Sequence, residues 1–354
     1  MLEEMIQKYN KKYYDGIIVL VANVYGKTSF LHDKCINIEA EFFTESEFDQ
    51  ILRSLKACGY TVICYFDENE FIKDYLKKQL VHEFLVFNLA RNGYGISKKS
   101  LIPTFCDLNS IKYTASNGYV CSFSRQKYHV NLLLKDLGLN FLKSYVYDNN
   151  SFLTNPTFNS TTKYIIKPLF ESASQGISSD SVYTGESYSD LKSLIDRKYT
   201  DLNRIPLLVQ EFISGYEAKT IIINFDKPYP LEPVGVEISG MRNLYNSIIT
   251  DKISFDYCHS NYLICNELGV DLANEIKNHA LIIYQAIGME NYGRIDCRID
   301  YQTNKIYFMD FSTMPYFVSG CEMEYVFNQM GQDLKGLLNA IINSALISKY
   351  NYSL

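Results

Sequence analysis

The sequence predicts an α/β protein whose N-terminal part is built on a parallel sheet. Short apolar runs alternate there with amphipathic helical stretches, a pattern typical of parallel strands joined by crossover helices. The chain has 354 residues, 47% of them hydrophobic, which at about 100–200 residues per domain indicates two or three domains with a sizeable core. With only 8 Pro and 18 Gly, a fibrous or disordered chain is not expected.

The first block of the chain, residues 1–114, carries this alternation. Strands are expected at 16–23, 60–66 and 83–89, and helices at 45–58 and 68–80. A polar loop at 91–99 follows the last of these strands, at the carboxyl edge where open α/β sheets bind ligands. We therefore expect this loop to form part of a binding site.

Two further blocks, 115–205 and 206–354, complete the predicted domain organisation. The second block is expected to hold a helix at 124–137 and a strand at 164–167. In the third, strands are expected at 206–212, 218–224, 233–238, 291–300 and 305–311, with helices at 271–287 and 328–347. The turn at 301–304 is short enough to join the last two strands as a hairpin.

Composition narrows the functional class. The 34 basic and 40 acidic residues give a formal charge of −6, which argues against a nucleic acid or an anionic membrane as partner. Residues 1–15 are polar and unlike a signal peptide, and the apolar run at 17–22 is far shorter than the ~20 residues of a membrane span. The nine cysteines show no C-x-x-C spacing and the histidines no zinc-site spacing, so we expect reduced thiols in the cytoplasm and no zinc.

A candidate phosphate site begins at Lys167-Pro168, where a strand ends. The loop that follows, residues 171–176, is rich in small residues. The lysine can supply positive charge to a polyphosphate while small residues let backbone N–H groups approach its oxygens. An ordinary β-turn is the competing interpretation.

A second candidate site lies on the expected hairpin. Strand alternation puts Arg294 and Asp296 on one face, and likewise Asp310 and Ser312. Two carboxylates and a hydroxyl on facing positions suit Mg²⁺, and the guanidinium could stabilise charge on a transferred phosphoryl group or an oxyanion. A solvent-facing hairpin with paired charges is the alternative.

A third candidate is the apolar strand that ends in Gln210 and Glu211. Its main-chain edge and side-chain amide could hold a flat heterocycle, and Glu217, beyond a glycine turn, could accept hydrogen bonds from ribose hydroxyls. An ordinary strand end with exposed acids is the competing interpretation.

In chain order these features resemble the ATP-grasp superfamily, and within it the D-alanine–D-alanine ligases and related amino-acid ligases. The matching features are Lys127 on a helix, Lys167-Pro168, the small-residue loop, Gln-Glu-Phe-Ile at 210–213, Gly-Arg-Ile-Asp at 293–296 and Asp-Phe-Ser-Thr-Met-Pro at 310–315. The resemblance covers roughly residues 85–345. It implies that an N-terminal α/β domain is followed by the two-domain, α+β ATP-grasp fold.

The resemblance also implies roles for individual residues. Lys127 and Lys167 would contact phosphates, and Ser174 and Gly176 would belong to the loop over the γ-phosphate. Adenine would be held by Gln210, Glu211 and Ile213, and the ribose by Glu217. Mg²⁺ would be bound by Asp296, Asp310 and Ser312, and Arg294 would stabilise the charge that develops during acyl transfer. The implied chemistry has two steps: ATP phosphorylates a carboxylate, and an amine then displaces phosphate.

Several positions differ from the pattern of that family. Asp310 and Ser312 stand where Glu and Asn are usual, and Tyr316 stands where glycine is usual. The segment 255–262 lacks the usual lysine, and Ala90-Arg91-Asn92 replaces the usual His-Gly. The ATP half of the pattern thus matches better than the amino-acid half.

We therefore expect substrates other than D-alanine, with Arg91, Arg242, Tyr262 and Tyr316 as candidate substrate contacts. The leading hypothesis is an ATP- and Mg²⁺-dependent carboxylate–amine ligase acting on small amino-acid-like molecules, and the resemblance allows a homodimer. One alternative is a degenerate ATP-grasp module that binds nucleotide for regulation without ligase activity. Another is an ATP-grasp kinase, or a ligase that modifies a protein tail.

Overall fold

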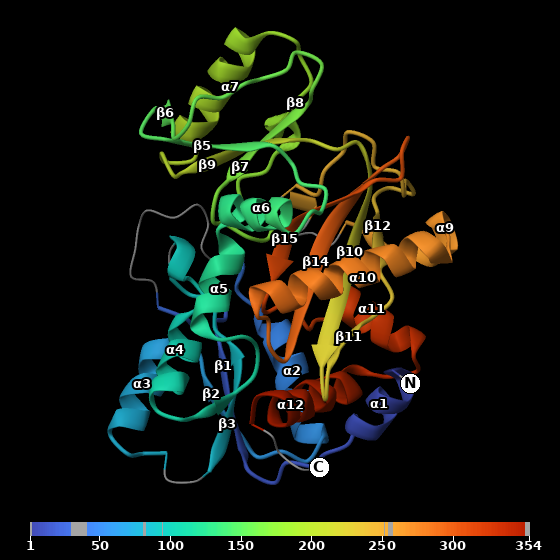
Figure 1. The fold of residues 1–354 in the computed structure, drawn as a ribbon. Helices are drawn as coiled ribbons and strands as arrows, with labels where there is room; N and C mark the ends of the chain where they lie inside the picture. Colours follow the sequence, from blue (N-terminus) through green and yellow to red (C-terminus); the bar gives the residue numbers. More distant parts are fainter. Residues whose placement is uncertain are drawn as a thin grey trace.

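The protein is described here by a computed structural model covering residues 2–29, 41–80, 83–93, 95–250, 252–253 and 258–350. These residues form sheets of four, six and five strands (Figure 1). The mixed α/β architecture, with a parallel N-terminal sheet and two antiparallel sheets, confirms the predicted fold class. Within the described ranges, no helix combines the length and apolarity needed to cross a membrane.

The N-terminal sheet is parallel and has the strand order β2-β1-β3-β4. Its strands are β1 (Ile17–Ala22), β2 (Val62–Tyr65), β3 (Phe84–Leu89) and β4 (Lys112–Tyr113), and its helices are α2 (Glu45–Ala57), α3 (Glu68–Leu76) and α4 (Leu101–Leu108). The apolar run of β1 is almost wholly buried, as expected for a parallel strand covered on both faces. Thr44 and Glu47 form a capping box that fixes the start of α2.

The central sheet is antiparallel, with the order β6-β5-β9-β7-β8. Its elements are β5 (Ser144–Asp148), β6 (Ser151–Phe152), β7 (Tyr164–Pro168), β8 (Val182–Tyr183), β9 (Leu207–Glu211), the 3-10 turn η3 (Ser179–Ser181) and helix α7 (Tyr188–Asp201). The strand expected at 206–212 as part of the third block lies in this sheet as β9. It pairs with β5 and β7, because hydrogen-bonded pairing, not position along the chain, decides sheet membership.

Two helices, not one, precede the central sheet. They are α5 (Gly118–Arg125) and α6 (Lys127–Asp136), while the expectation was a single helix at 124–137. Gln126 separates them with a backbone conformation of φ −82° and ψ 79°, which is not helical. The break places Lys127 at the first position of α6.

The C-terminal sheet is antiparallel, with the order β13-β12-β10-β14-β15 and with β11 paired to β10. Its strands are β10 (Gly215–Asn224), β11 (Pro228–Pro230), β12 (Val234–Glu237), β13 (Ser260–Leu263), β14 (Tyr292–Asp300) and β15 (Ile306–Ser312). The helices that follow β13 or lie beyond the sheet are α9 (Ile264–Leu268), α10 (Val270–Ile287), α11 (Glu322–Gln329) and α12 (Leu334–Tyr350). The strands β14 and β15 form the predicted hairpin.

The N-terminal and C-terminal sheets share one core around α12. Leu20 of β1, Ile221 of β10 and Leu338 of α12 belong to the same cluster of buried apolar side chains. Helix α1 (Leu2–Tyr9) packs beside α12 (Figure 1). The central sheet lies at the far end of the molecule in that view, beyond α6.

Candidate active site

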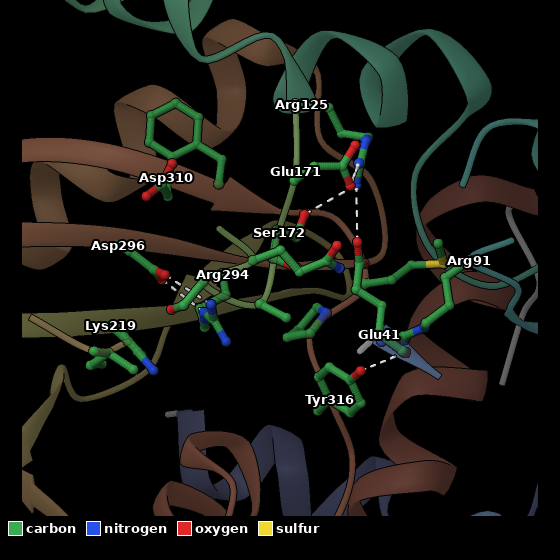
Figure 2. Close-up of a pocket in the computed structure, with 18 of the residues that line it drawn as sticks. Glu41, Arg91, Arg125, Glu171, Ser172, Lys219, Arg294, Asp296, Asp310 and Tyr316 are labelled. Atoms are coloured by element: carbon green, nitrogen blue, oxygen red, sulfur yellow. Dashed lines mark hydrogen bonds and ion pairs between the residues drawn. The ribbon is translucent and has the colours of Figure 1, made fainter. Parts of the chain in front are cut away.

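A cavity of about 860 Å³ lies where the three parts of the chain meet. It is lined by the loop after β3, by α6, by the loop after β7 and by the β14–β15 hairpin (Figure 2). A smaller cavity of about 80 Å³ lies beside β9. The two share Lys167, Ser174, Glu217 and Asp310, so they form one continuous candidate site.

The hairpin carries a bidentate charge pair that lines this site. Asp296 lies opposite Asp310 in the ladder, and Arg294 lies opposite Ser312. The Arg294 guanidinium donates from Nε to Asp296 Oδ1 at 2.7 Å and from Nη2 to Oδ2 at 2.8 Å. Burial raises the pKa of Asp296, and the contact with Arg294 opposes that shift. All four side chains line the large cavity.

Glu322 extends this pair into a buried network. At the first position of α11, it forms ion pairs with Lys219 of β10 and with Arg294, whose Nη1 lies 3.5 Å from Glu322 Oε2. Burial alone would raise the pKa of Glu322, but Lys219 and Arg294 hold it well below its usual range. Lys219 and Glu322 are not among the site residues predicted from the sequence. The only local signal was the alternation of Lys219 with Glu217 along one strand.

Lys167 and Lys127 bring positive charge to the opposite wall. Lys167 Nζ lies 3.2 Å from Asp310 Oδ2, and Lys127 Nζ donates to the Glu171 carbonyl oxygen at 2.5 Å. Burial lowers the pKa of Lys127 to about 8. Burial would raise the pKa of Asp310, but the two lysines outweigh it and lower that pKa.

The acidic pair on the hairpin fits a small divalent cation. Asp310 Oδ1 is buried and has no hydrogen-bond partner among the described residues, so it is an acceptor without a donor. Mg²⁺ is commonly held by one or two carboxylates together with substrate phosphates. Asp310, the facing Asp296 and the Ser312 hydroxyl match that pattern. No group of three or more His, Cys, Asp or Glu side chains in the described ranges could hold a metal by itself.

The loop after β7 is held in an uncommon backbone conformation. Ala173 and Ser174 have φ of 54° and 55°, and Gly176 has φ of 72°. A Cβ on Gly176 would lie 2.9 Å from Pro168 Cγ and 3.0 Å from Leu202 Cδ2, so glycine is needed there. Ser174 lines both cavities, whereas Gly176 lies behind the lining and fixes the turn.

The smaller cavity gathers the residues expected around adenine and ribose. Gln210, Glu211, Ile213 and Glu217 all line it. Glu211 Oε2 accepts a hydrogen bond from the Lys143 backbone N–H at 3.1 Å. Burial raises the pKa of Glu217 despite the positive charges of Arg298 and Lys219. The wall also contains apolar side chains, including Ile165, Ile248 and Met309.

Of the four candidate substrate contacts, Arg91 and Tyr316 line the large cavity. Arg242 and Tyr262 line neither cavity. The Arg242 guanidinium pairs with Glu237 at 3.0 Å and Glu267 at 2.8 Å, which holds it over the Tyr262 ring. The segment 255–262 is described only from residue 258 onward, so its first part lies outside the described residues.

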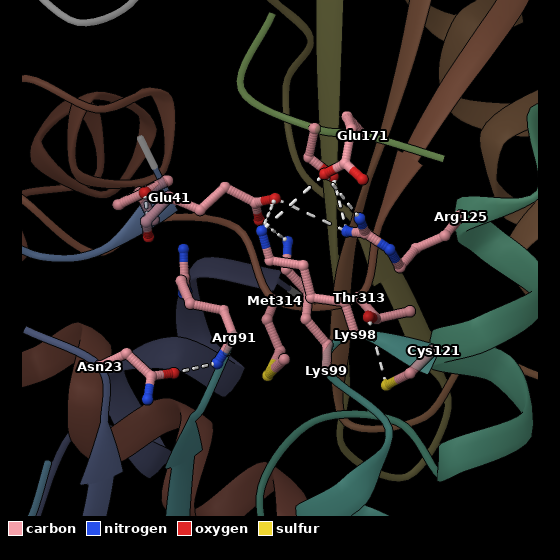
Figure 3. Close-up of polar contacts among 12 residues, drawn as sticks. Asn23, Glu41, Arg91, Lys98, Lys99, Cys121, Arg125, Glu171, Thr313 and Met314 are labelled. Atoms are coloured by element: carbon pink, nitrogen blue, oxygen red, sulfur yellow. Dashed lines mark hydrogen bonds and ion pairs between the residues drawn. The ribbon is translucent and has the colours of Figure 1, made fainter. Parts of the chain in front are cut away.

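A cluster of charged side chains not foreseen from the sequence lies beside Arg91. Glu41 is buried between Lys98 at 2.8 Å, Lys99 at 2.6 Å and Arg125 at 3.7 Å (Figure 3). Burial alone would raise the pKa of Glu41, but the three cations hold it well below its usual range. Burial lowers the pKa of Lys99 to about 7. Arg125 also reaches Glu171, at 3.4 Å.

Comparison with known sequences identifies several related proteins. The sequence model of the family described as D-ala D-ala ligase C-terminus matches residues 133–343. The D-alanine–D-alanine ligase of Carboxydothermus hydrogenoformans is 25% identical over 271 residues, covering 75% of this chain and 82% of that protein. That of Wolbachia pipientis subsp. Culex pipiens is 22% identical over 299 residues, covering 84% and 87%.

Solved structures show the same fold. The D-alanine–D-alanine ligase from Bacillus anthracis complexed with ATP superposes with a TM-score of 0.67 at 14% identity, covering 94% of this chain and 97% of that one. The VanG D-Ala:D-Ser ligase from Enterococcus faecalis gives a TM-score of 0.62 at 15% identity, covering 94% and 100%. These similarities extend across the N-terminal sheet as well as the two antiparallel sheets.

Proposed function

Because the chain belongs to the D-ala D-ala ligase C-terminal family and is thus an ATP-dependent, ADP-forming carboxylate–amine ligase, we propose that it joins two amino-acid-like substrates through an acyl phosphate. The observation that carries this proposal is the convergence of Lys167, Asp310, Asp296 and Arg294 on one cavity. Such a site can neutralise charge on both a phosphoryl group and an oxyanion.

The proposed reaction has two balanced steps. In the first, a carboxylate oxygen of the donor attacks the γ-phosphorus of ATP, and ADP leaves. In the second, the acceptor amine attacks the acyl carbon, inorganic phosphate leaves, and the nitrogen loses a proton as the amide forms. Lys127 and Lys167 would neutralise phosphate oxygens, and Arg294 would stabilise the oxyanion that forms on the acyl carbon. Positioning the two substrates in one cavity supplies the rest of the rate enhancement.

The remaining site residues fit supporting roles in this proposal. Asp296, Asp310 and Ser312 would hold Mg²⁺, which when bound supplies positive charge to the phosphates. Ser174 and Gly176 would belong to the loop over the γ-phosphate. In the smaller cavity, Gln210, Glu211 and Ile213 would hold adenine and Glu217 the ribose.

We also propose a cytoplasmic location and a homodimer. The location rests on the nine cysteines without C-x-x-C spacing, and the dimer rests on resemblance to the family. Light scattering of the purified chain tests the assembly. The alternative of a nucleotide-binding module without ligase activity finds no support among the four relatives described above, which are ligases by name.

Turnover with defined substrates tests the proposed function. The full chain is incubated with ATP, Mg²⁺ and pools of D- and L-amino acids, and ADP, AMP and phosphate are measured. We expect pool-dependent ADP and phosphate, and a product whose mass equals two substrates minus one water. Nucleotide binding without ADP formation from any pool would contradict the proposal, and AMP as the product would exclude the acyl-phosphate route.

A further inference from the structure

Arg91 is a buried guanidinium whose terminal nitrogens have no hydrogen-bond partner in the described part of the chain. The residue is 0% exposed, yet it lines the large cavity. Its Nε donates to the Leu89 carbonyl oxygen at 3.2 Å, while Nη1 and Nη2 have no hydrogen-bond partner among the described residues. A buried charged group without a partner is strongly unfavourable, so such a group normally has a counterion.

The position of Arg91 is fixed by its neighbours. Its guanidinium carbon lies 4.6 Å from the centroid of the Phe43 ring and 4.4 Å from that of Tyr316. Its backbone N–H donates to Asn23 Oδ1 at 2.5 Å. The Tyr316 hydroxyl in turn donates to the Glu41 carbonyl oxygen at 2.5 Å, which holds that ring in place (Figure 2). The two aromatic rings favour a cation between them, and the Tyr316 hydroxyl lies beside the guanidinium, but neither ring supplies the negative charge of a counterion.

The nearby carboxylates are already engaged by other cations. Glu41 and Glu171 form ion pairs with Lys98, Lys99 and Arg125 (Figure 3). This cluster therefore has three cations and two carboxylates before Arg91 is counted.

Glu68, another carboxylate of this region, accepts hydrogen bonds from the Asn23 amide at 3.0 Å and from the Asn92 backbone at 3.1 Å. Glu47 caps α2 through Thr44. Among the described residues, these contacts leave no carboxylate as a hydrogen-bonded partner for the terminal nitrogens of Arg91, whose buried side chain lies in the wall of the large cavity.

We propose that Arg91 binds a substrate carboxylate other than the one that is phosphorylated. The planar fork of a guanidinium matches a carboxylate with two parallel hydrogen bonds. Arg91 lines the same cavity as Arg294 and Asp310 of the hairpin, so one bound substrate can present one group to Arg91 and another to the hairpin.

This proposal rests on the proposed ligase function and defines a substrate class. The non-reacting carboxylate has two chemical sources: the side chain of an acidic donor, or the carboxylate of an amino-acid acceptor. Comparing the rates with aspartate and with asparagine as the donor tests the first source. Comparing the rates with an amino acid and with its own carboxamide as the acceptor tests the second.

The experiment compares kcat/KM for these pairs in the wild type and in Arg91→Ala and Arg91→Lys. We expect Arg91→Ala to lower kcat/KM for the carboxylate-bearing member of one pair by about 10- to 150-fold. Its amide counterpart should change by less than about threefold. Arg91→Lys should keep part of the preference, because it keeps the charge but loses the fork. Arg53→Ala, on the exposed face of α2, is the matched control and should leave both pairs unchanged.

Equal losses for both members of both pairs, or no loss at all, would overturn the proposal. If the wild type forms ADP with neutral substrates only, and prefers a carboxylate neither in the donor side chain nor in the acceptor, the proposed ligase function is supported and the inference about Arg91 is overturned. If no pool supports ADP formation, the proposed function fails, and calorimetric titration with aspartate and asparagine still tests Arg91. Binding of aspartate that weakens in Arg91→Lys would then support the inference, and equal or absent binding would overturn it.

Discussion

Lys167 of the central sheet pairs with Asp310 of the C-terminal sheet, with 3.2 Å between Nζ and Oδ2. The strands that carry them, β7 and β15, belong to different sheets and share no hydrogen-bonded ladder. The second oxygen of Asp310 has no hydrogen-bond partner in the described part of the chain. One carboxylate therefore joins the two walls of the cavity and still has capacity for a further cation.

Asp310→Asn is expected to raise the Mg²⁺ concentration needed for half-maximal ADP formation by about 10- to 100-fold, because the carboxylate loses the charge that attracts the ion. Titration of Mg²⁺ at saturating ATP measures this. Asp201→Asn, at an exposed position at the end of α7, serves as the control and should leave the titration unchanged. The same Mg²⁺ dependence in Asp310→Asn and the wild type would remove Asp310 from the metal site.

The affinity for ATP is expected to decrease as the pH rises above about 8. Burial lowers the pKa of Lys127 from its usual 10.5 to about 8 in the free protein, so the lysine is neutral above that pH. Binding a polyphosphate then requires uptake of a proton, which costs up to about 1.4 kcal/mol, or tenfold in affinity, per pH unit. Calorimetry from pH 7 to pH 10 measures the dissociation constant.

The matched variant for this pH series is Lys127→Arg. A guanidinium stays charged over the whole range, so its pH dependence should be flat. The stability of the wild type should follow the opposite trend. The pKa of Lys127 is about 8 in the folded protein and 10.5 in the unfolded chain. Between these pH values Lys127 is protonated in the unfolded state but not in the folded state, so the free energy of unfolding rises with pH. A flat wild-type affinity profile would show that Lys127 does not contact the phosphates.

The hairpin part of the site could be predicted from the sequence because strand alternation is a local rule. Arg294 and Asp296, two residues apart, lie on one face of β14, and the short turn after it brings Asp310 and Ser312 opposite them. Turn length and a period of two residues sufficed. The parallel N-terminal sheet was predictable for the same reason, since buried strands and amphipathic helices differ in period.

The charge networks could not be predicted, because they depend on contacts between distant parts of the chain. Lys219 and Glu322 are 103 residues apart, and each alone looks like an ordinary surface charge. The expectation that β9 belongs to the third block was wrong for a related reason. Its apolar sequence fits any buried strand, and only its pairing with β5 and β7 decides where it lies.

Glu322→Ala is expected to destabilise the protein by about 3–5 kcal/mol, because it removes the ion-pair partner of the buried Lys219. Arg294 also loses one of its two carboxylate partners and keeps only Asp296. Urea unfolding measures the free energy of unfolding. Glu275→Ala, at an exposed position of α10, should change it by no more than about 0.5 kcal/mol. A loss as small as that of the control would mean that water or a shifted side chain compensates Lys219.

Arg91→Met is expected to stabilise the substrate-free protein by about 1–4 kcal/mol. The methionine keeps the apolar stem between Phe43 and Tyr316 but removes a buried charge that has no counterion in the described residues. Thermal unfolding without substrates should therefore give an equal or higher Tm than the wild type. Added aspartate, or the preferred amino-acid acceptor, should raise the Tm of the wild type and not that of the variant.

Arg298→Met provides the matched comparison. Arg298 is also buried and also lies 4.6 Å from a phenylalanine ring, that of Phe212, but it is paired with Glu217 and donates to backbone carbonyl oxygens. Its removal should destabilise the protein by about 3–5 kcal/mol, because the buried carboxylate of Glu217 loses its ion-pair partner. Two arginines in similar aromatic surroundings should thus respond with opposite signs. A lower Tm for Arg91→Met would mean that Arg91 serves folding and not substrate binding.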